Sequence, residues 1–252
     1  MIPVPDTAMV LAAGLGTRLR PLTDRTPKPL ITVAGRSLLD HCIDRLVEAG
    51  VRRAVVNIHW LGSQIREHLA ARRDIAVTIS DESGELLETG GGIARALPLL
   101  GDAPFLAVNA DVIWRDYGGD ALRRLAATFD PAAMDGLLLL QPRETATGHG
   151  GPGDFDLDPG GRLVRRGAKP AAGYVYTGVQ LLQPGLFADA PAGAFSLNLL
   201  YDRAIAAGRL HGLVHQGDWM DVGTHDGLAI AEAMLTGPDS AGPGSAGPGN
   251  DA

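Results

Sequence analysis

The sequence predicts an α/β fold in which helices cover both faces of a mixed, mostly parallel sheet. Short apolar runs alternate along the chain with longer segments whose apolar residues recur every three or four positions. That alternation is typical of strands joined by amphipathic helices, and it favours a parallel sheet. The chain has 252 residues, of which 45% are hydrophobic and 20% are charged. A chain of this length and composition can bury one large core.

The first half of the chain contains a clear succession of predicted elements. Residues 8–13 (AMVLAA) form a buried strand, and a helix follows that Ser37 caps and Gly50 ends. The apolar residues that share one face of this helix are Leu38, Leu39, Cys42, Ile43 and Leu46. The other elements predicted here are strands at 53–58, 75–80, 105–108 and 136–140, a helix at 61–71, and a helix that starts in the glycines 90–92 and continues through 93–100.

The second half of the chain contains more glycine and proline. Residues 147–173 are expected to form loops around short strands at 155–157 and 162–165, and such a stretch inside a domain is usually functional or mobile. The other elements predicted here are a long strand at 174–182, a helix that Ser196 caps and that runs to 207, and a strand at 219–222 followed by a final helix at 224–235. We therefore predict one domain at 1–236 and a flexible tail at 237–252, which has no large apolar side chain.

Charge and cysteine content exclude several classes of function. The formal net charge of −7 argues against a general binder of nucleic acid or of anionic membranes. The single cysteine, Cys42, excludes an internal disulfide and a multi-cysteine metal site, and its place on an apolar helix face predicts a core residue. No secretory signal and no long apolar segment is visible, so we expect a soluble cytoplasmic protein.

The cationic residues are strongly biased toward arginine. Of the 22 cationic side chains only Lys28 and Lys169 are lysines, and each is followed by proline. Lysine carries a compact ammonium on a flexible stem, whereas arginine presents a planar fork. A lysine in such a chain is retained either by chance or where a mobile point charge is needed.

Residues 11–30 (LAAGLGTRLRPLTDRTPKPL) contain the most informative motif. Gly14 and Gly16 follow the first strand, so their backbone can approach a ligand and turn N–H groups toward an anion. The loop is not a Walker A loop, and Leu19 stands where a dinucleotide fingerprint has its third glycine. Lys28 lies between two prolines, which gives its ammonium a rigid mount. The alternative is an ordinary proline-rich surface turn with solvated cations.

This segment resembles the signature of the sugar-1-phosphate nucleotidyltransferases, L-A-A-G-x-G-x-R-[LM]-x-P-L-T-x-x-x-P-K-P-L, and matches every fixed position over residues 11–30. The resemblance implies a Rossmann-like three-layer (GT-A-like) fold. In that family the glycine loop wraps a nucleoside triphosphate, the arginine contacts its phosphates and the lysine neutralises charge at the reacting phosphate. By resemblance the catalytic residues are Arg18 and Lys28, and the nucleotide-binding residues are Ala13, Gly14, Gly16, Thr17, Arg18 and Lys28.

Two further segments place carboxylates at strand ends. Asn109 and Asp111 follow an apolar strand (FLAVNADV), and Asp221 ends another (WMDVGT). Carboxylates there can hold Mg²⁺, although each segment alone also suits an ordinary polar cap. The resemblance implies that Asp111 and Asp221 bind Mg²⁺, the expected cofactor, and that Asn109 contacts the sugar substrate. These aspartates are 110 positions apart, so only the fold can bring them together.

The segment at 86–93 (LLETGGGI) resembles one branch of the family, the N-acetylmuramate-1-phosphate uridylyltransferases of cell-wall recycling. Many relatives have Gly-Thr where this chain has Glu88 and Thr89. The stretches at 57–65 (NIHWLGSQI), 153–155 (GDF) and 195–197 (FSL) support the same branch. The resemblance implies that Glu88, Thr89 and Gly90 bind the nucleotide and that Asp154 contacts the sugar. The alternative for the glycines is a flexible turn at the start of a helix.

The chain departs from the family pattern at two positions. Alanine stands at 110, where glycine is usual, and at 168, where many relatives have glutamate before Lys-Pro. The second departure leaves the role of Lys169 open.

The resemblance implies transfer of UMP from UTP to a sugar 1-phosphate, with N-acetylmuramate 1-phosphate as the best candidate acceptor. The sugar phosphate attacks the α-phosphorus in line, and pyrophosphate leaves. The expected partners are therefore UTP and a sugar 1-phosphate, with no nucleic acid or membrane, and the protein is expected to be a monomer or a small homo-oligomer. Guanylyl or thymidylyl transfer to mannose 1-phosphate or glucose 1-phosphate remains an alternative, and so does a non-catalytic nucleotide-binding module.

Overall fold

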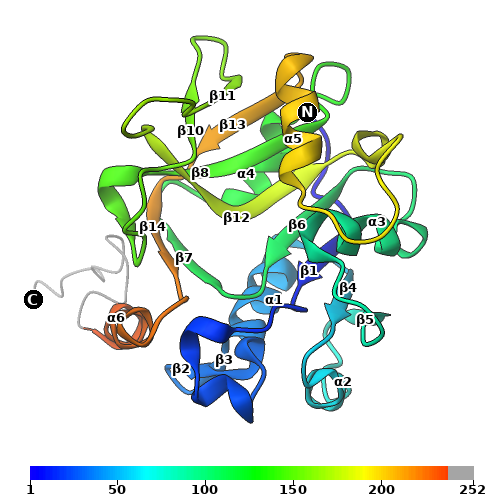
Figure 1. Ribbon diagram of the computed structural model, residues 1–252, viewed down its shortest axis with the longest axis vertical. Helices are drawn as coiled ribbons and strands as arrows, with labels where there is room; N and C mark the ends of the chain where they lie inside the picture. The colour runs from blue at the N-terminus through cyan, green and yellow to red at the C-terminus, as the bar shows by residue number, and fades with distance from the viewer. Residues whose placement is uncertain (238–252) are drawn as a thin grey trace, which may run out of the picture.

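The computed structural model describes residues 1–237 of the chain. At its centre lies a sheet of nine strands (Figure 1). Seven strands lie side by side in the order β11 (Leu163–Arg165), β10 (Phe155–Leu157), β12 (Tyr174–Leu182), β6 (Phe105–Asn109), β1 (Thr7–Leu11), β4 (Arg53–Ile58) and β5 (Ala76–Asp81). In addition β8 (Gly136–Pro142) pairs with β12, and β13 (Leu210–Val214) pairs with β8. The neighbours β6, β1, β4 and β5 are parallel, whereas β12 is antiparallel to both β6 and β8. The predicted mixed sheet is confirmed.

The register of the parallel strands brings polar side chains to one edge of the sheet. Leu11, the last residue of β1, is paired with Asn57 of β4 on one side and with Asn109 of β6 on the other. Ligands of open α/β sheets bind beyond these carboxyl ends. The residues that follow Leu11 therefore enter a space that is bordered by two asparagines.

Helices cover both faces of the sheet. They are α1 (Leu38–Ala49), α2 (Gly62–Leu69), α3 (Glu88–Leu100), α4 (Ala121–Thr128), α5 (Asn198–Ala206) and α6 (His225–Thr236). Ala8 and Val10 of β1 point into a core that also contains side chains of α1, α2 and α4. Met9, between them, points into a second core with side chains of α3 and α5. This alternation follows from the pleat of a strand and gives the molecule its three layers.

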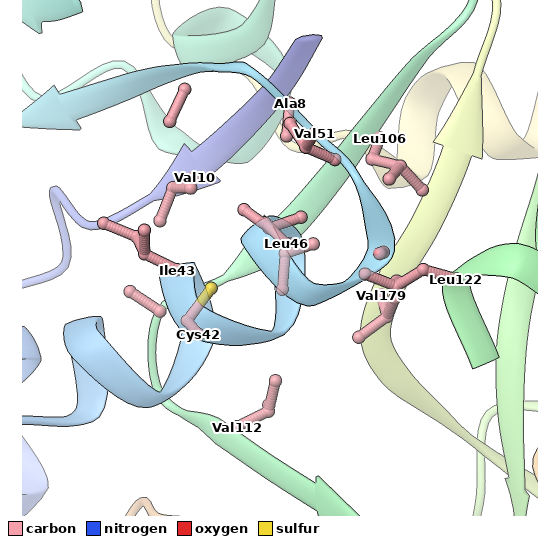
Figure 2. Close-up of a cluster of buried hydrophobic side chains, with 14 of the residues drawn as sticks. Ala8, Val10, Cys42, Ile43, Leu46, Val51, Leu106, Val112, Leu122 and Val179 are labelled. Carbon is pink, nitrogen blue, oxygen red and sulfur yellow. The ribbon is translucent and has the colours of Figure 1, made fainter. Parts of the chain in front are cut away.

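Helix α1 shows how closely local signals set an element's limits. The Ser37 hydroxyl accepts a hydrogen bond of 3.0 Å from the backbone N–H of Asp40, and Gly50 ends the helix with φ of 106°. Both predicted caps are confirmed. Cys42 is 0% exposed and packs among the apolar side chains between α1 and β1 (Figure 2), so the prediction of a core residue is also confirmed.

Two predicted helix starts are wrong in detail. Helix α3 begins at Glu88, before the triple glycine, because the glycines pack closely enough against the protein to remain helical. Helix α5 has Leu197 rather than Ser196 at its cap, although the Ser196 hydroxyl does accept a hydrogen bond from the backbone N–H of Asn198.

A second, three-stranded sheet joins distant parts of the chain. It consists of β7 (Val112–Asp116), β14 (Gly217–Asp221) and β9 (Ala146–Thr147). The antiparallel pairing of β14 with β7 sets Asp221 opposite Val112, the residue after Asp111. This pairing is the structural reason why two aspartates far apart in sequence meet. A two-stranded ribbon, β2 (Thr32–Val33) and β3 (Arg36–Ser37), precedes α1.

Strands β7 and β13 and helix α4 were not among the predicted elements. The tail predicted at 237–252 lies outside the described residues except for Gly237, which ends α6. No helix within residues 1–237 has the length and apolar character needed to cross a membrane.

Candidate active site

A cavity of about 240 Å³ lies at the carboxyl ends of β1, β4 and β6. It is lined by Leu11, Ala12, Ala13, Gly14, Lys28, Pro29, Asn57, Leu86, Glu88, Thr89, Asn109, Ala110 and Asp111. The lining thus comes from the glycine loop, from the end of β4, from the start of α3 and from the Asn-Ala-Asp segment. These include three of the four segments that the sequence singled out.

The glycine loop turns sharply at Gly16. Its φ is 63°, and a Cβ there would lie 2.9 Å from Cγ2 of Thr23 and 3.0 Å from Cβ of Lys28. The Thr23 hydroxyl donates a hydrogen bond of 2.9 Å to the carbonyl of Gly16, and the Trp60 indole donates one of 2.9 Å to the carbonyl of Thr23. Trp60 therefore supports the loop from behind. Gly14, by contrast, faces open space in the cavity.

We expect Gly16→Ala to lower the free energy of unfolding by more than Gly35→Ala. Both glycines have positive φ, 63° and 76°, but only Gly16 is crowded by neighbouring side chains. The conformational cost alone is about 1–2 kcal/mol, and crowding adds to it at Gly16. Urea denaturation of the two variants measures the difference. Equal losses would show that the contacts with Thr23 and Lys28 do not constrain the loop.

Lys28 occupies the floor of the cavity next to a carboxylate. Its side chain lies between Pro27 and Pro29, and the residue is only 8% exposed. Its Nζ donates a hydrogen bond of 2.5 Å to Oδ2 of Asp111. Since lysine is rarely buried without a partner, this ion pair accounts for a nearly buried lysine on the cavity floor.

Asp111 and Asp221 lie close together where β14 pairs with β7. The backbone N–H of Val222 donates a hydrogen bond of 3.1 Å to the carbonyl of Asp111, which fixes the two strand ends together. Burial raises the pKa of Asp221, and the nearby charge of Asp111 raises it further, whereas Lys28 and Arg18 act in the opposite direction. Nη2 of Arg18 lies 3.7 Å from Oδ2 of Asp221. Two cations and two carboxylates from three segments thus form one cluster.

The donor set of this cluster fits Mg²⁺. Within residues 1–237 no group of three or more His, Cys, Asp or Glu side chains is placed to hold a metal ion. Mg²⁺ is usually bound through one or two carboxylates, and substrate phosphates and water complete its shell. Burial and the nearby charge of Asp111 both raise the pKa of Asp221, and a bound cation would favour the ionised carboxylate.

The segment that contains Glu88 and Thr89 forms the opposite wall of the cavity. Glu88 has φ of 59°, an uncommon conformation for a residue with a side chain. The Thr89 hydroxyl accepts a hydrogen bond of 3.0 Å from the backbone N–H of Leu197. The N–H groups of Gly90 and Gly91 donate to the carbonyl of Phe195 at 2.9 and 3.1 Å.

The glycines of this segment are required by packing. A Cβ on Gly90 would lie 2.3 Å from the Phe195 ring, and a Cβ on Gly91 would lie 2.3 Å from the carbonyl oxygen of Gly193. Gly90, a predicted nucleotide-binding residue, is therefore buried behind the cavity wall and is not among its lining residues. Its contact with the nucleotide stays a prediction.

A second cavity, of about 130 Å³, adjoins the first. The two share Leu11, Thr89 and Asn109, and the other lining residues of the smaller one are Tyr176, Gln180, Leu197, Asn198 and Tyr201. The Tyr201 hydroxyl donates a hydrogen bond of 2.5 Å to Oε1 of Gln180. Burial raises the pKa of both Tyr176 and Tyr201, so both phenols stay protonated.

The predicted sugar contacts occupy different positions around this second cavity. Asn109 lines both cavities. Asp154 lies behind Tyr176, and its Oδ2 accepts a hydrogen bond of 2.8 Å from that residue's backbone N–H. Gly16, Thr17 and Arg18 form the turn beyond Gly14 and do not line either cavity.

Lys169 lies apart from the cluster. Its side chain is 61% exposed, and its Nζ contacts Oδ2 of Asp156 at 2.8 Å. The carboxylate partner of Lys169 is therefore Asp156 of β10. The two lysines of the chain therefore have different environments, one inside the candidate site and one on the surface.

Sequence reasoning assigned no role to Asn57, Tyr176 or Gln180. All three are polar residues inside or at the end of otherwise apolar strands, which was the available signal. Their contribution to the cavities becomes visible only when the strands are placed side by side.

Comparison with known proteins gives a consistent result. The chain is 45% identical to an N-acetylmuramate alpha-1-phosphate uridylyltransferase of Caulobacter vibrioides over 93% of this chain and 99% of the relative. It is 40% identical to the protein of the same name from Neisseria meningitidis serogroup B, over 90% of this chain and 97% of the relative. Its fold resembles that of the inositol-1-phosphate CTP transferase from T. maritima, with a TM-score of 0.76 and 16% identity, over 94% of this chain and 99% of that one.

The family match covers nearly all of the described residues. Residues 7–237 match the family described as nucleotidyl transferase, so the match includes all three sheets, the two cavities described above and the cluster around Lys28. The chain is therefore an enzyme of the nucleotidyl transferase family.

Proposed function

We propose that this protein transfers UMP from UTP to a sugar 1-phosphate, with N-acetylmuramate 1-phosphate as its preferred acceptor, in peptidoglycan recycling. The observation that carries the proposal is the cluster of Lys28, Asp111, Asp221 and Arg18 at the strand ends. Such a cluster suits a reaction in which two anionic phosphates must approach each other. The names of the relatives from Caulobacter and Neisseria support the choice of UTP and of the acceptor.

The proposed reaction needs no general base. A phosphate monoester is largely a dianion near pH 7, so its oxygen can attack without losing a proton. The new bond joins this oxygen to the α-phosphorus of UTP, while the bond from the α-phosphorus to the leaving pyrophosphate breaks. The barrier comes mainly from repulsion between the two anions and from charge that develops on the leaving group. Catalysis is then a matter of position and electrostatics.

The residues of the cluster have distinct roles in this proposal. Lys28 neutralises charge at the reacting phosphates, because its ammonium is the cation on the floor of the cavity. The amides around Gly14 and the exposed guanidinium of Arg18 hold the leaving pyrophosphate. Glu88 and Thr89 on the opposite wall then face the nucleoside.

Asp111 and Asp221 are the proposed holders of Mg²⁺. When bound, the ion supplies positive charge that lowers the repulsion between the sugar phosphate and the α-phosphate. We expect EDTA to reduce pyrophosphate release to below ~1% and added Mg²⁺ to restore it, because two carboxylates alone would repel the substrates. The melting temperature in EDTA serves as the control for folding. Full activity in EDTA would exclude a metal-dependent reaction.

The smaller cavity is the proposed sugar subsite. It adjoins the phosphate cluster through Asn109 and offers phenol and amide groups from Tyr176, Gln180 and Tyr201. Hydroxyl and acetamido groups of a sugar can pair with such donors and acceptors. Asp154 holds the backbone of Tyr176 and so supports this subsite from behind.

A coupled assay of pyrophosphate release tests the choice of substrates. UTP is offered with N-acetylmuramate 1-phosphate, N-acetylglucosamine 1-phosphate, glucose 1-phosphate or mannose 1-phosphate, and each acceptor is repeated with GTP and dTTP. We expect the highest kcat/KM for UTP with N-acetylmuramate 1-phosphate. A higher value for GTP or dTTP with mannose or glucose 1-phosphate would identify a guanylyl- or thymidylyltransferase. Binding of nucleotides without pyrophosphate release in any combination would favour a non-catalytic module.

A further inference from the structure

A buried carboxylate stands behind the main cavity without any part in the proposed chemistry. Glu82 follows β5 and is 1% exposed, and its neighbour Asn57, at the end of β4, is 2% exposed. Within residues 1–237 no lysine, arginine or histidine side chain forms an ion pair with Glu82. A buried carboxylate is costly unless its oxygens are hydrogen-bonded, so its partners show what it does.

These partners form one continuous chain of hydrogen bonds across the back of the cavity. The backbone N–H of Ala12 donates to Oδ1 of Asn57 at 2.7 Å, and Nδ2 of Asn57 donates to Oε1 of Glu82 at 2.8 Å. The backbone N–H of Leu87 donates to Oε2 of Glu82 at 3.2 Å. One end of the chain is thus the glycine loop, and the other end is the segment that leads into Glu88.

The donor and the acceptor of every hydrogen bond in this chain are fixed. A backbone N–H can only donate, so the amide oxygen of Asn57 has to face Ala12 and its NH₂ group has to face Glu82. Both oxygens of Glu82 then face N–H groups, one from Asn57 and one from Leu87. Leu87 immediately precedes α3, whose N-terminal end favours a negative charge. A carboxylate therefore suits position 82 without a cationic partner.

The third glycine of the ETGGG segment belongs to the same arrangement. A Cβ on Gly92 would lie 2.8 Å from Oε1 of Glu82 and 2.9 Å from Nδ2 of Asn57. Glycine at 92 therefore lets α3 pass close to the pair. Helix α3, β4, β5 and the glycine loop all meet at these two side chains.

The position of this chain of hydrogen bonds behind the cavity indicates which part of a substrate it would affect. The phosphates of a nucleotide belong near Lys28 and Gly14, where the ammonium and the backbone amides of the glycine loop lie. The nucleoside must then lie toward the other end of the cavity, between Ala12 on one wall and Leu86 to Thr89 on the other. The hydrogen-bonded chain connects these two walls and leaves the smaller, sugar-side cavity untouched.

We propose that Glu82 and Asn57 are positioning residues that set the separation of the two walls between which the nucleoside of the triphosphate binds. The inference rests on the proposed function, because it takes the nucleotide to occupy the main cavity. Neither residue acts on the reacting phosphates. Their effect is to hold the backbone at Ala12 and at Leu87 at a fixed spacing, so that the slot exists before the nucleotide arrives.

The fixed polarity allows an experiment with a built-in rescue. Glu82→Gln places an NH₂ group where an acceptor is needed, and Asn57→Asp sets two carboxylates against each other. In the double variant Asn57→Asp/Glu82→Gln the new carboxylate at 57 accepts from Ala12 and from the new amide at 82, whose oxygen accepts from Leu87. All three hydrogen bonds and the net charge are then restored. Glu85→Gln, at an exposed residue of the same loop, is the matched control.

We expect each single variant to raise the Kd for UTP, measured by calorimetry without a sugar phosphate, at least ~10-fold. The KM for the sugar phosphate and the kcat at saturation should change less than about threefold, because neither depends on the nucleoside slot. The double variant should return the Kd to within about threefold of the wild type, and Glu85→Gln should not change it. If the KM values for UTP and for the sugar phosphate both rose in step with a fall in melting temperature, Glu82 and Asn57 would have a merely structural role. That result would overturn the inference.

Two additions keep the test decisive. Gly92→Ala brings a methyl group into steric contact with Glu82 and Asn57 without removing a polar group, so it should also weaken UTP binding. This variant keeps the test informative even if a single variant fails to fold, and unchanged UTP binding would contradict the inference. GTP, CTP and dTTP are titrated alongside UTP, so the slot is tested with whichever nucleotide binds. One outcome separates the two proposals. If the wild type binds a triphosphate but forms no sugar nucleotide, and if binding is lost in the single variants and restored in the double variant, the proposed function is refuted and the inference is supported. Single variants that bind every triphosphate like the wild type would refute the inference alone.

Discussion

Lys28→Ala is expected to lower turnover at least ~10²-fold while the protein stays folded, which corresponds to a loss of about 2.7 kcal/mol of transition-state stabilisation. The ammonium is 8% exposed and mounted on the cavity floor, where water cannot easily replace it. A preorganised charge in such a place acts on the transition state more strongly than a solvated one. Steady-state kinetics at saturating UTP and sugar phosphate measure the effect, and circular dichroism checks the fold.

The chain offers a matched control for this prediction. Lys169→Ala removes the only other lysine, which also precedes a proline but is 61% exposed and paired with Asp156. We expect its turnover to stay within about threefold of the wild type, because exposed ion pairs contribute little. If Lys28→Ala behaved like Lys169→Ala, the assignment of Lys28 to the reacting phosphates would be wrong.

Asp111→Ala is the second prediction with a large expected effect, again at least ~10²-fold in turnover. Asp111 meets Lys28 at 2.5 Å and has Asp221 as its neighbour, so its loss removes one of two proposed metal ligands and also frees the ammonium. We expect the Mg²⁺ concentration at half-maximal activity to rise together with the fall in kcat. A Mg²⁺ titration of pyrophosphate release measures both quantities.

Asp156→Ala provides the comparison for Asp111→Ala. It also deletes an aspartate that pairs with a lysine, but this pair lies at the surface. Its kcat and its Mg²⁺ requirement should remain close to those of the wild type. An Asp111→Ala enzyme with an ordinary Mg²⁺ titration and normal kcat would remove the basis for a metal site at this position.

Local signals were sufficient to predict most of the sheet and its helices. The capping Ser37, the closing Gly50 and the apolar face between them determine α1, and their geometry in the structure agrees. Strands β4 and β12 were predicted with their observed bounds, because both are rich in β-branched or aromatic residues and end at turns. Each of these predictions depends on residues that are only a few positions apart along the chain.

The elements that were missed carry weaker or shorter signals. Helix α4 has eight residues, although Asp120 caps it and Leu122 and Leu125 face the core, a pattern that was available in the sequence. Strand β7 follows β6 after only two residues and contains Arg115 and Asp116. Its pairing with β14, about a hundred residues further on, is a tertiary contact that local propensity does not encode.

The candidate site shows the same difference between local signals, which the sequence contains, and long-range contacts, which only the fold creates. The motifs predicted Lys28, Asp111 and Asp221 individually, but their meeting depends on the pairing of β14 with β7. Glu82 could not be found from the sequence, because an acidic residue in a Ser- and Gly-containing loop is typical of an exposed turn. Only the structure shows that it is 1% exposed and bonded to Asn57.

The central claim is that this site joins the α-phosphate of a nucleoside triphosphate to a sugar phosphate. ³¹P NMR of a mixture of protein, Mg²⁺, UTP and N-acetylmuramate 1-phosphate tests it most directly, since it follows every phosphorus atom at once. We expect the sugar-phosphate signal to be replaced by the two coupled signals of a UDP-sugar, with one pyrophosphate formed for each. Release of orthophosphate, or unchanged spectra with this and every other pairing of triphosphate and sugar phosphate, would contradict the account.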